Sequence, residues 1–131
     1  MSEFQTDRYR LRSFTNPNPK IDYISRLNGD ALNGDLTVSF SYVPDKLVLL
    51  TAAFHEYLAD IQITETAALE PVALQVLDDI NNEVVPRWVE VKIWARSESK
   101  KSTDVIVIDQ QPKWTNPSLL ARLDYFTLPL R

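Results

Sequence analysis

Alternating apolar and polar residues mark the clearest strands of this chain. Over residues 36–42 every second position is apolar and the positions between them are Thr or Ser, which is the period of a strand with one buried face. Residues 87–96 alternate in the same way, and residues 104–109 contain four consecutive β-branched side chains. The pattern predicts strands over these three segments, with a further strand over 20–27 and a short extended piece over 47–50.

Apolar residues at helical spacing predict two helices between the second and third of these strands. In residues 52–61 the apolar positions follow i, i+3, i+4 and i+7, and the later pattern, which begins within 66–70 and is closed by Pro86, is longer. A further short helix is predicted over 118–126. The second helix has the apolar stripe Leu69, Val72, Ala73, Val76, Leu77 and Ile80, with Glu70, Gln75, Asp78, Asp79 and Asn82 predicted on the opposite, outward face.

Turn signals divide the first half of the chain. Asn28-Gly29-Asp30 and Asn33-Gly34-Asp35 both favour turns, so the connection between the first two strands is expected to be short and rich in turns. Residues 1–19 are expected to form an irregular lead-in, because their Asn-Pro-Asn-Pro end favours extended backbone.

The order of elements predicts one α+β domain over residues 1–131. Two strands, two helices and two strands favour an antiparallel four-stranded sheet with both helices on one face. On the strand over 87–96, Trp88 and Trp94 fall on the face away from the helices. We expect another subunit to cover this second face.

Composition excludes several classes of chemistry. The 131 residues contain no cysteine, two glycines and a single histidine, so thiolate chemistry, Gly-rich phosphate loops and multi-histidine metal sites are all excluded. The net charge of −4 gives no reason to expect nucleic-acid or membrane binding. The first twelve residues have no apolar signal-peptide core, and no apolar run is long enough to span a membrane. We therefore expect a cytoplasmic protein.

Several short stretches resemble the 7-cyano-7-deazaguanine reductase (QueF) family. They are Asn16-Pro17 with Ile21-Asp22-Tyr23, Ser41-Tyr42-Val43-Pro44-Asp45-Lys46, Val76-Leu77-Asp78-Asp79-Ile80 and Pro86-Arg87-Trp88. The resemblance covers about residues 15–109 and leaves 110–131 as a C-terminal tail. It implies a tunnelling fold, in which ββααββ subunits assemble into barrels. The family reduces a nitrile to an aminomethyl group with NADPH, on the route to queuosine in tRNA.

The chain departs from this family at each motif that carries the reaction. The segment 28–35 lacks the nucleophilic cysteine, without which no thioimide forms, and serine or threonine is far weaker without a base. Leucine replaces the acidic residue that anchors the substrate, and residues 98–101 replace a basic Arg-Gly-Gly segment. The resemblance therefore implies no catalytic residue and no cofactor, and we expect no metal. The NADPH motif falls on Leu50, Ala52, Ala53, His55 and Tyr57, of which only Tyr57 is retained, and the anchoring pair falls on Ala68 and Leu69.

Four residues remain candidates for binding a purine-like or pterin-like ligand: His55, Tyr57, Glu65 and Glu70. Each has a plainer interpretation, since His55 beside Glu56 is an ordinary surface pair and Glu70 suits the first turn of a helix. The adjacent Asp78 and Asp79 resemble a carboxylate pair, yet neighbouring helix residues diverge.

Three hypotheses follow for the function. The leading one is a non-catalytic homo-oligomer that binds a ligand or has a structural role. The second is an enzyme of different chemistry at a subunit interface, with Glu65, Glu70 or His55 as the acid or base. The third is a partner subunit that docks on an active reductase.

Overall fold

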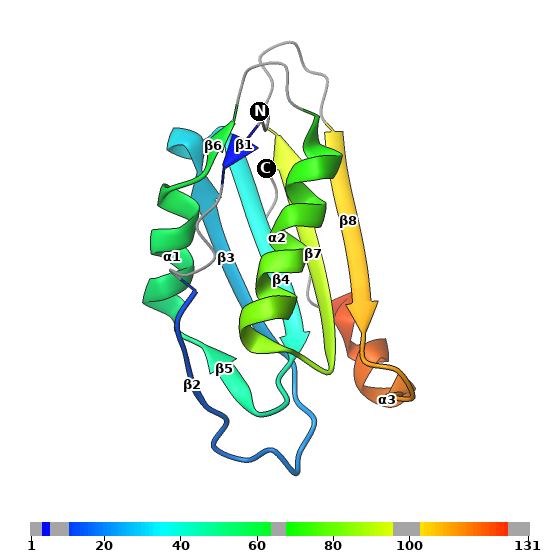
Figure 1. The fold of residues 1–131 in the computed structure, drawn as a ribbon. Helices are drawn as coiled ribbons and strands as arrows, with labels where there is room; N and C mark the ends of the chain where they lie inside the picture. The colour runs from blue at the N-terminus through cyan, green and yellow to red at the C-terminus, as the bar shows by residue number, and fades with distance from the viewer. Residues whose placement is uncertain (1–3, 6–10, 64–67, 96–102, 126–131) are drawn as a thin grey trace.

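The fold is a mixed α/β arrangement with antiparallel sheets (Figure 1). The structure is a computed structural model that describes residues 4–5, 11–63, 68–95 and 103–125. Its main sheet has four strands in the order β3-β4-β7-β8, and each neighbouring pair is antiparallel. The bounds are β3 (Ser25–Ala31), β4 (Leu36–Val43), β7 (Trp88–Ala95) and β8 (Thr103–Gln110).

Two helices cover one face of this sheet, as predicted (Figure 1). Helix α1 (Thr51–Ala59) packs on β3, and helix α2 (Leu69–Val84) packs on both β7 and β8. Among the described residues the third α-helix, α3 (Pro117–Leu120), continues into the 3-10 helix η3 (Ala121–Tyr125) beyond the end of β8. None of the described helices has the length and apolar character that crossing a bilayer requires.

Two small sheets tie the N-terminal segment to the body. Strand β1 (Phe4–Gln5) pairs with β6 (Gln62–Ile63), and β2 (Ser13–Thr15) pairs with β5 (Leu47–Leu49). The expectation of a wholly irregular lead-in was therefore wrong. The extended piece predicted over 47–50 is confirmed as β5. It is the strand with which β2 pairs, and the sequence pattern did not predict this pairing.

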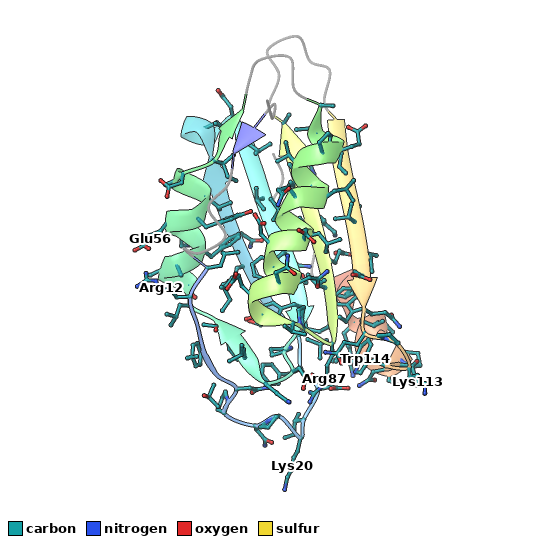
Figure 2. All side chains as sticks on the ribbon, in the orientation of Figure 1. Arg12, Lys20, Glu56, Arg87, Lys113 and Trp114 are labelled. Carbon is teal, nitrogen blue, oxygen red and sulfur yellow. The ribbon has the colours of Figure 1, made fainter. Side chains whose placement is uncertain are left out.

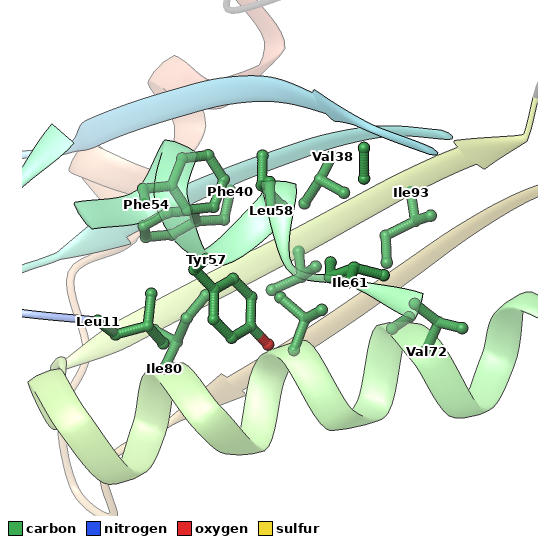
Figure 3. Close-up of a cluster of buried hydrophobic side chains, with 14 of the residues drawn as sticks. Leu11, Val38, Phe40, Phe54, Tyr57, Leu58, Ile61, Val72, Ile80 and Ile93 are labelled. Carbon is green, nitrogen blue, oxygen red and sulfur yellow. The ribbon is translucent and has the colours of Figure 1, made fainter. Parts of the chain in front are cut away.

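The core lies between the helices and the sheet (Figure 3). The alternation over residues 36–42 is confirmed, because its four apolar side chains are at most 2% exposed and face the helices. The two helices and the strands over 87–96 and 104–109 are also confirmed within one to three residues at their ends. Ten of the core residues are labelled in Figure 3: Leu11, Val38, Phe40, Phe54, Tyr57, Leu58, Ile61, Val72, Ile80 and Ile93.

The first strand of the sheet lies later in the sequence than predicted. The turn expected at Asn28-Gly29-Asp30 was wrong, since β3 runs through all three residues and the connection is the 3-10 helix η2 (Leu32–Gly34). Close packing explains the glycine, because a Cβ atom at position 29 would lie 2.5 Å from Leu58 Cδ1 on α1. The glycine thus permits close approach of a helix, and Gly34 with φ of 92° makes the turn.

The second face of the sheet is partly buried within a single chain. Trp88 and Trp94 on β7 are 3% and 9% exposed, and Ser39 and Ser41 on β4 are each 2% exposed. The two tryptophans are thus buried within a single chain, and the covering of this face by another subunit stays a prediction.

Candidate functional site

A buried polar cluster joins the two helices. Tyr57 on α1 donates a hydrogen bond of 2.6 Å to Asp79 Oδ2 on α2, and Gln75 Nε2 donates one of 2.7 Å to Asp79 Oδ1. Figure 3 shows the Tyr57 ring in the core with its oxygen toward α2. Asp79 is 1% exposed and Tyr57 is fully buried. The sequence placed Asp79 on the outward face, which was wrong: position 79 lies at the margin of the buried stripe, where Tyr57 satisfies its carboxylate.

The sequence-predicted ligand residues are not brought together within one subunit. Tyr57 is enclosed in the core, whereas His55 lies on the exposed side of α1. Glu70 is exposed in the first turn of α2. Glu65 lies outside the described residues. The neighbour of His55, Glu56, forms an exposed ion pair of 2.8 Å with Arg12 (Figure 2).

The positions aligned with the family's reaction motifs offer little chemistry. Ala52, Ala53 and Ala68 have only methyl side chains, and Leu69 is partly buried against the core. The segment 98–101, aligned with the basic motif, lies outside the described residues. Among the residues that the structure describes, no group of three or more His, Cys, Asp or Glu side chains is arranged to hold a metal ion.

The densest polar network in the described parts surrounds Arg87, immediately before β7. Its Nη1 donates to Asp22 Oδ1 and to the carbonyl of Pro44, both at 3.1 Å. Its Nη2 donates to the carbonyl of Pro19 at 2.6 Å and to Asp45 Oδ1 at 3.1 Å. The Arg87 side chain is 17% exposed, so the guanidinium is largely enclosed by these four acceptors. Its planar fork suits such a set of converging oxygens.

The same carboxylates hold the segment that follows β8. Asp22 Oδ2 accepts hydrogen bonds from Trp114 Nε1 at 3.2 Å and from Asn116 Nδ2 at 3.0 Å. Asp45 Oδ2 accepts one of 3.0 Å from Gln111 Nε2. Figure 2 shows Arg87 and Trp114 side by side at the end of the sheet where β8 terminates. This end of the molecule is therefore closed by the two carboxylates that also pair with Arg87.

Asn16 extends the network into the loop before β3. Its Oδ1 accepts from the Tyr23 hydroxyl at 2.8 Å and from the Asn18 backbone N–H at 3.0 Å. Its Nδ2 donates to the carbonyl of Asp45 at 2.7 Å, and Asn16 itself is 2% exposed. In the sequence, the network residues Asn16, Asp22, Asp45 and Arg87 stood out only as members of the stretches that resemble the family. The one available signal was the placing of Asp22, Asp45 and Arg87 at ends of predicted strands.

A separate polar contact lies on the second face of the sheet. Arg26 Nε donates to Ser41 Oγ at 3.0 Å, and burial lowers the pKa of Arg26 while the nearby Glu90 opposes that shift. Glu90 also pairs with Lys92 at 3.4 Å. An arginine remains charged in such surroundings. Arg26 and Ser41 lie opposite each other on β3 and β4, so their contact is a cross-strand pair.

Comparisons with known proteins give similarity to solved structures alone. Models of known protein families do not match this chain, and no curated protein matches it either. The structure is similar to a solved structure described as the archaeosine synthase QueF-Like in the apo form. The identity is 17%, the match covers 72% of this chain and 96% of the other, and the TM-score is 0.47. Values this low do not place the chain in that protein's family.

Proposed function

We propose that this chain is a tunnelling-fold protein related to the 7-cyano-7-deazaguanine reductases, without their activity. It acts as a non-catalytic homo-oligomer that binds a ligand or has a structural role. One observation carries the proposal: the motif residues Asn16, Asp22, Asp45 and Arg87 belong to a single hydrogen-bonded network. The residues that support the resemblance are thus residues that hold the fold.

At the positions aligned with the family's reaction motifs, this chain lacks the residues that the reaction needs. A covalent nitrile adduct needs a thiolate, and the sequence has no cysteine. Recognition of a purine-like base needs a buried acceptor, whereas Leu69 stands at the aligned position. The NADPH 2′-phosphate needs cationic partners, and Ala52 and His55 stand where the family's motif has its two lysines. Loss of chemistry with retention of the scaffold is the combination expected of a non-catalytic relative.

The arrangement of elements also supports the tunnelling fold. The main sheet follows β3-β4-α1-α2-β7-β8 along the chain, with the two helices on one face. This is the ββααββ order of the proposed subunit, decorated by the small β1-β6 and β2-β5 sheets. The acid/base alternative is less well supported, because His55 and Glu70 lie exposed on different helices. Within one subunit they form no acid/base pair of the kind that alternative needs.

The deciding experiment is turnover of 7-cyano-7-deazaguanine with NADPH. We expect no oxidation of NADPH above a control without protein, under conditions in which an active reductase of that family turns over. Enzyme-dependent oxidation would overturn the proposed loss of activity. Thermal shift with guanine-type and pterin-type compounds tests the ligand role, with Glu70→Gln as the variant expected to reduce any shift. A shift that the variant leaves unchanged would remove Glu70 from the site.

A further inference from the structure

A strip of buried residues runs along the middle of the second face of the main sheet. Ser39 and Ser41 on β4 are each 2% exposed, and Trp88 and Trp94 on β7 are 3% and 9% exposed. These four residues, the buried strip, lie on the face away from the helices, because they alternate with core residues such as Phe40. The burial is that of a single chain, so the chain itself supplies the cover.

The cover of the buried strip is narrow. On the same face of the neighbouring strand β8, Ile106 and Ile108 are 57% and 56% exposed. They lie opposite Lys92 and Glu90 of β7, one strand away from the strip. Neighbouring strands lie about 4.8 Å apart, so the change from buried to exposed takes place within about one strand width. A single extended segment laid along β4 and β7 accounts for a boundary this sharp.

The helices α3 and η3 bring the chain to the second face. Figures 1 and 3 show them on the side of the sheet away from α2. In Figure 1 they lie at the end of the sheet where β7 begins and β8 terminates, which is the Trp88 end of the buried strip. The last residue of η3 is Tyr125, and residues 126–131 lie outside the described residues. The segment 126–131 therefore starts from one end of the strip.

The sequence of this segment suits an extended conformation with one buried side. Residues 126–131 read Phe-Thr-Leu-Pro-Leu-Arg, in which every second residue is apolar. This is the period of an extended segment with one buried face. Pro129 disfavours a helix and keeps Leu128 extended, because proline restricts the residue before it. Phe126, Leu128 and Leu130 then share one side of the segment, and Thr127 lies on the other.

We propose that residues 126–131 form a strap that runs over the buried strip of its own chain, from the Trp88 end to Trp94. The lengths agree, because the six residues from Trp88 to Trp94 on β7 span about 20 Å. Six residues of extended chain beyond Tyr125 also span about 20 Å. The serines at the centre of the strip are small and let the strap approach the sheet closely. The apolar side of the strap packs on the tryptophans.

Charge favours the same path. Trp94 lies opposite Asp104 on β8 and Thr37 on β4, and Thr37 lies opposite Asp30 on β3. The row at the far end of the strip thus has a carboxylate on each flank, and the strap brings the long cationic side chain of Arg131 to this row. The strap lies on the face of the sheet and leaves the edges of β3 and β8 free to pair. It is therefore compatible with the proposed homo-oligomer.

A dye near the end of the strap tests its path, because the natural chain contains no cysteine. Leu130→Cys labelled with bimane keeps an apolar group at this position, and tryptophan quenches bimane emission near contact. We expect the label to be quenched and Trp94→Phe to restore its emission. The control is a label at Glu70→Cys, an exposed position on α2 across the sheet, whose emission should not change with Trp94→Phe.

Matched variants of the strap provide the second measurement. In the chain labelled at position 130, Leu128→Asp should restore the emission, because it sets a charge against the buried strip. Thr127→Asp lies on the other side of the extended segment and should leave the label quenched. Circular dichroism checks that each variant is folded. A label that Trp94→Phe leaves unchanged, or equal effects of the two aspartates, would overturn the proposal.

Refolding with unlabelled chains shows whether the strap stays on its own subunit. Labelled chains that carry Trp94→Phe are refolded together with an excess of wild-type chains. Their emission should remain high, because each strap covers its own sheet. Quenching by the wild-type chains would show that the segment lies on a neighbouring subunit and would overturn the proposal. None of these results bears on nitrile turnover, so this proposal and the proposed function can fail separately.

Discussion

The Tyr57 hydroxyl on α1 donates a hydrogen bond of 2.6 Å to Asp79 on α2, and both side chains are buried. A carboxylate in this position is stable only when strong donors replace the water that it has lost. The contact therefore couples the two helices chemically, in addition to their apolar packing against the sheet.

Replacing Tyr57 by phenylalanine is expected to destabilise the protein by about 1–3 kcal/mol, because the buried Asp79 carboxylate loses its donor on α1. Urea unfolding followed by circular dichroism measures the change. Asp78→Asn is the matched control, since Asp78 is the exposed neighbour on the same helix and should change stability by at most about 0.5 kcal/mol. Equal effects of the two variants would contradict a specific role for the buried contact.

Replacing Arg87 by lysine should cost about 2–4 kcal/mol, because a lysine cannot reach Asp22, Asp45 and two carbonyls together. The same urea titration applies. Arg12→Lys is the control, since the Arg12–Glu56 pair is exposed on both sides and should contribute about 0–1 kcal/mol. If Arg87→Lys lowers the free energy of unfolding no more than Arg12→Lys does, the network around Arg87 does not stabilise the fold as described.

Stability should fall at alkaline pH in part through Tyr42. Burial raises the pKa of Tyr42, and the Leu49 N–H that donates to its hydroxyl oxygen opposes this shift only in part. The unfolded chain ionises near pH 10 and the folded chain higher, so the unfolded state binds fewer protons and the free energy of unfolding drops as pH rises above about 10. Urea unfolding between pH 8 and 11 should show a smaller drop for Tyr42→Phe. The same drop in both proteins would exclude Tyr42 as a source.

Replacing Gly29 by alanine should destabilise the protein by about 1–3 kcal/mol, because the added methyl group meets Leu58 on α1. The effect should shrink when Leu58→Ala is also present, since the shortened side chain leaves room. A double-mutant cycle from thermal or urea unfolding measures this coupling. Additive effects of the two substitutions would contradict the close contact.

Periodicity in the sequence predicted the layers of the fold because those layers are set by local pattern. The stripe at Val72, Val76 and Ile80 and the alternation through Val38 and Phe40 both reflect burial of one face. The pattern failed at Gly29, where a contact with a residue far along the chain decided the conformation. A local turn signal carries no information about such a contact.

The polar contacts were less predictable than the apolar ones. Asp79 looked like a surface residue because its donor, Tyr57, lies on another helix. The four acceptors of Arg87 lie 42 to 68 positions before it in the sequence, and no local pattern links them to it. The candidate ligand residues were chosen for lying at or near the family's motif positions, and within one subunit the structure leaves His55 and Glu70 apart on separate helices.

The closure of the network by Trp114 and Asn116 has a consequence for how the chain folds. Their contacts with Asp22 span 92 and 94 positions, so they form only after two segments far apart in the sequence have come together. Closing such long loops is entropically costly and slow compared with forming the α2 helix or the β7-β8 hairpin. A nascent chain still lacking residue 116 therefore has its core segments but cannot complete this end. The segment after β8 thus locks the loop before β3, and we expect this lock to form late in folding.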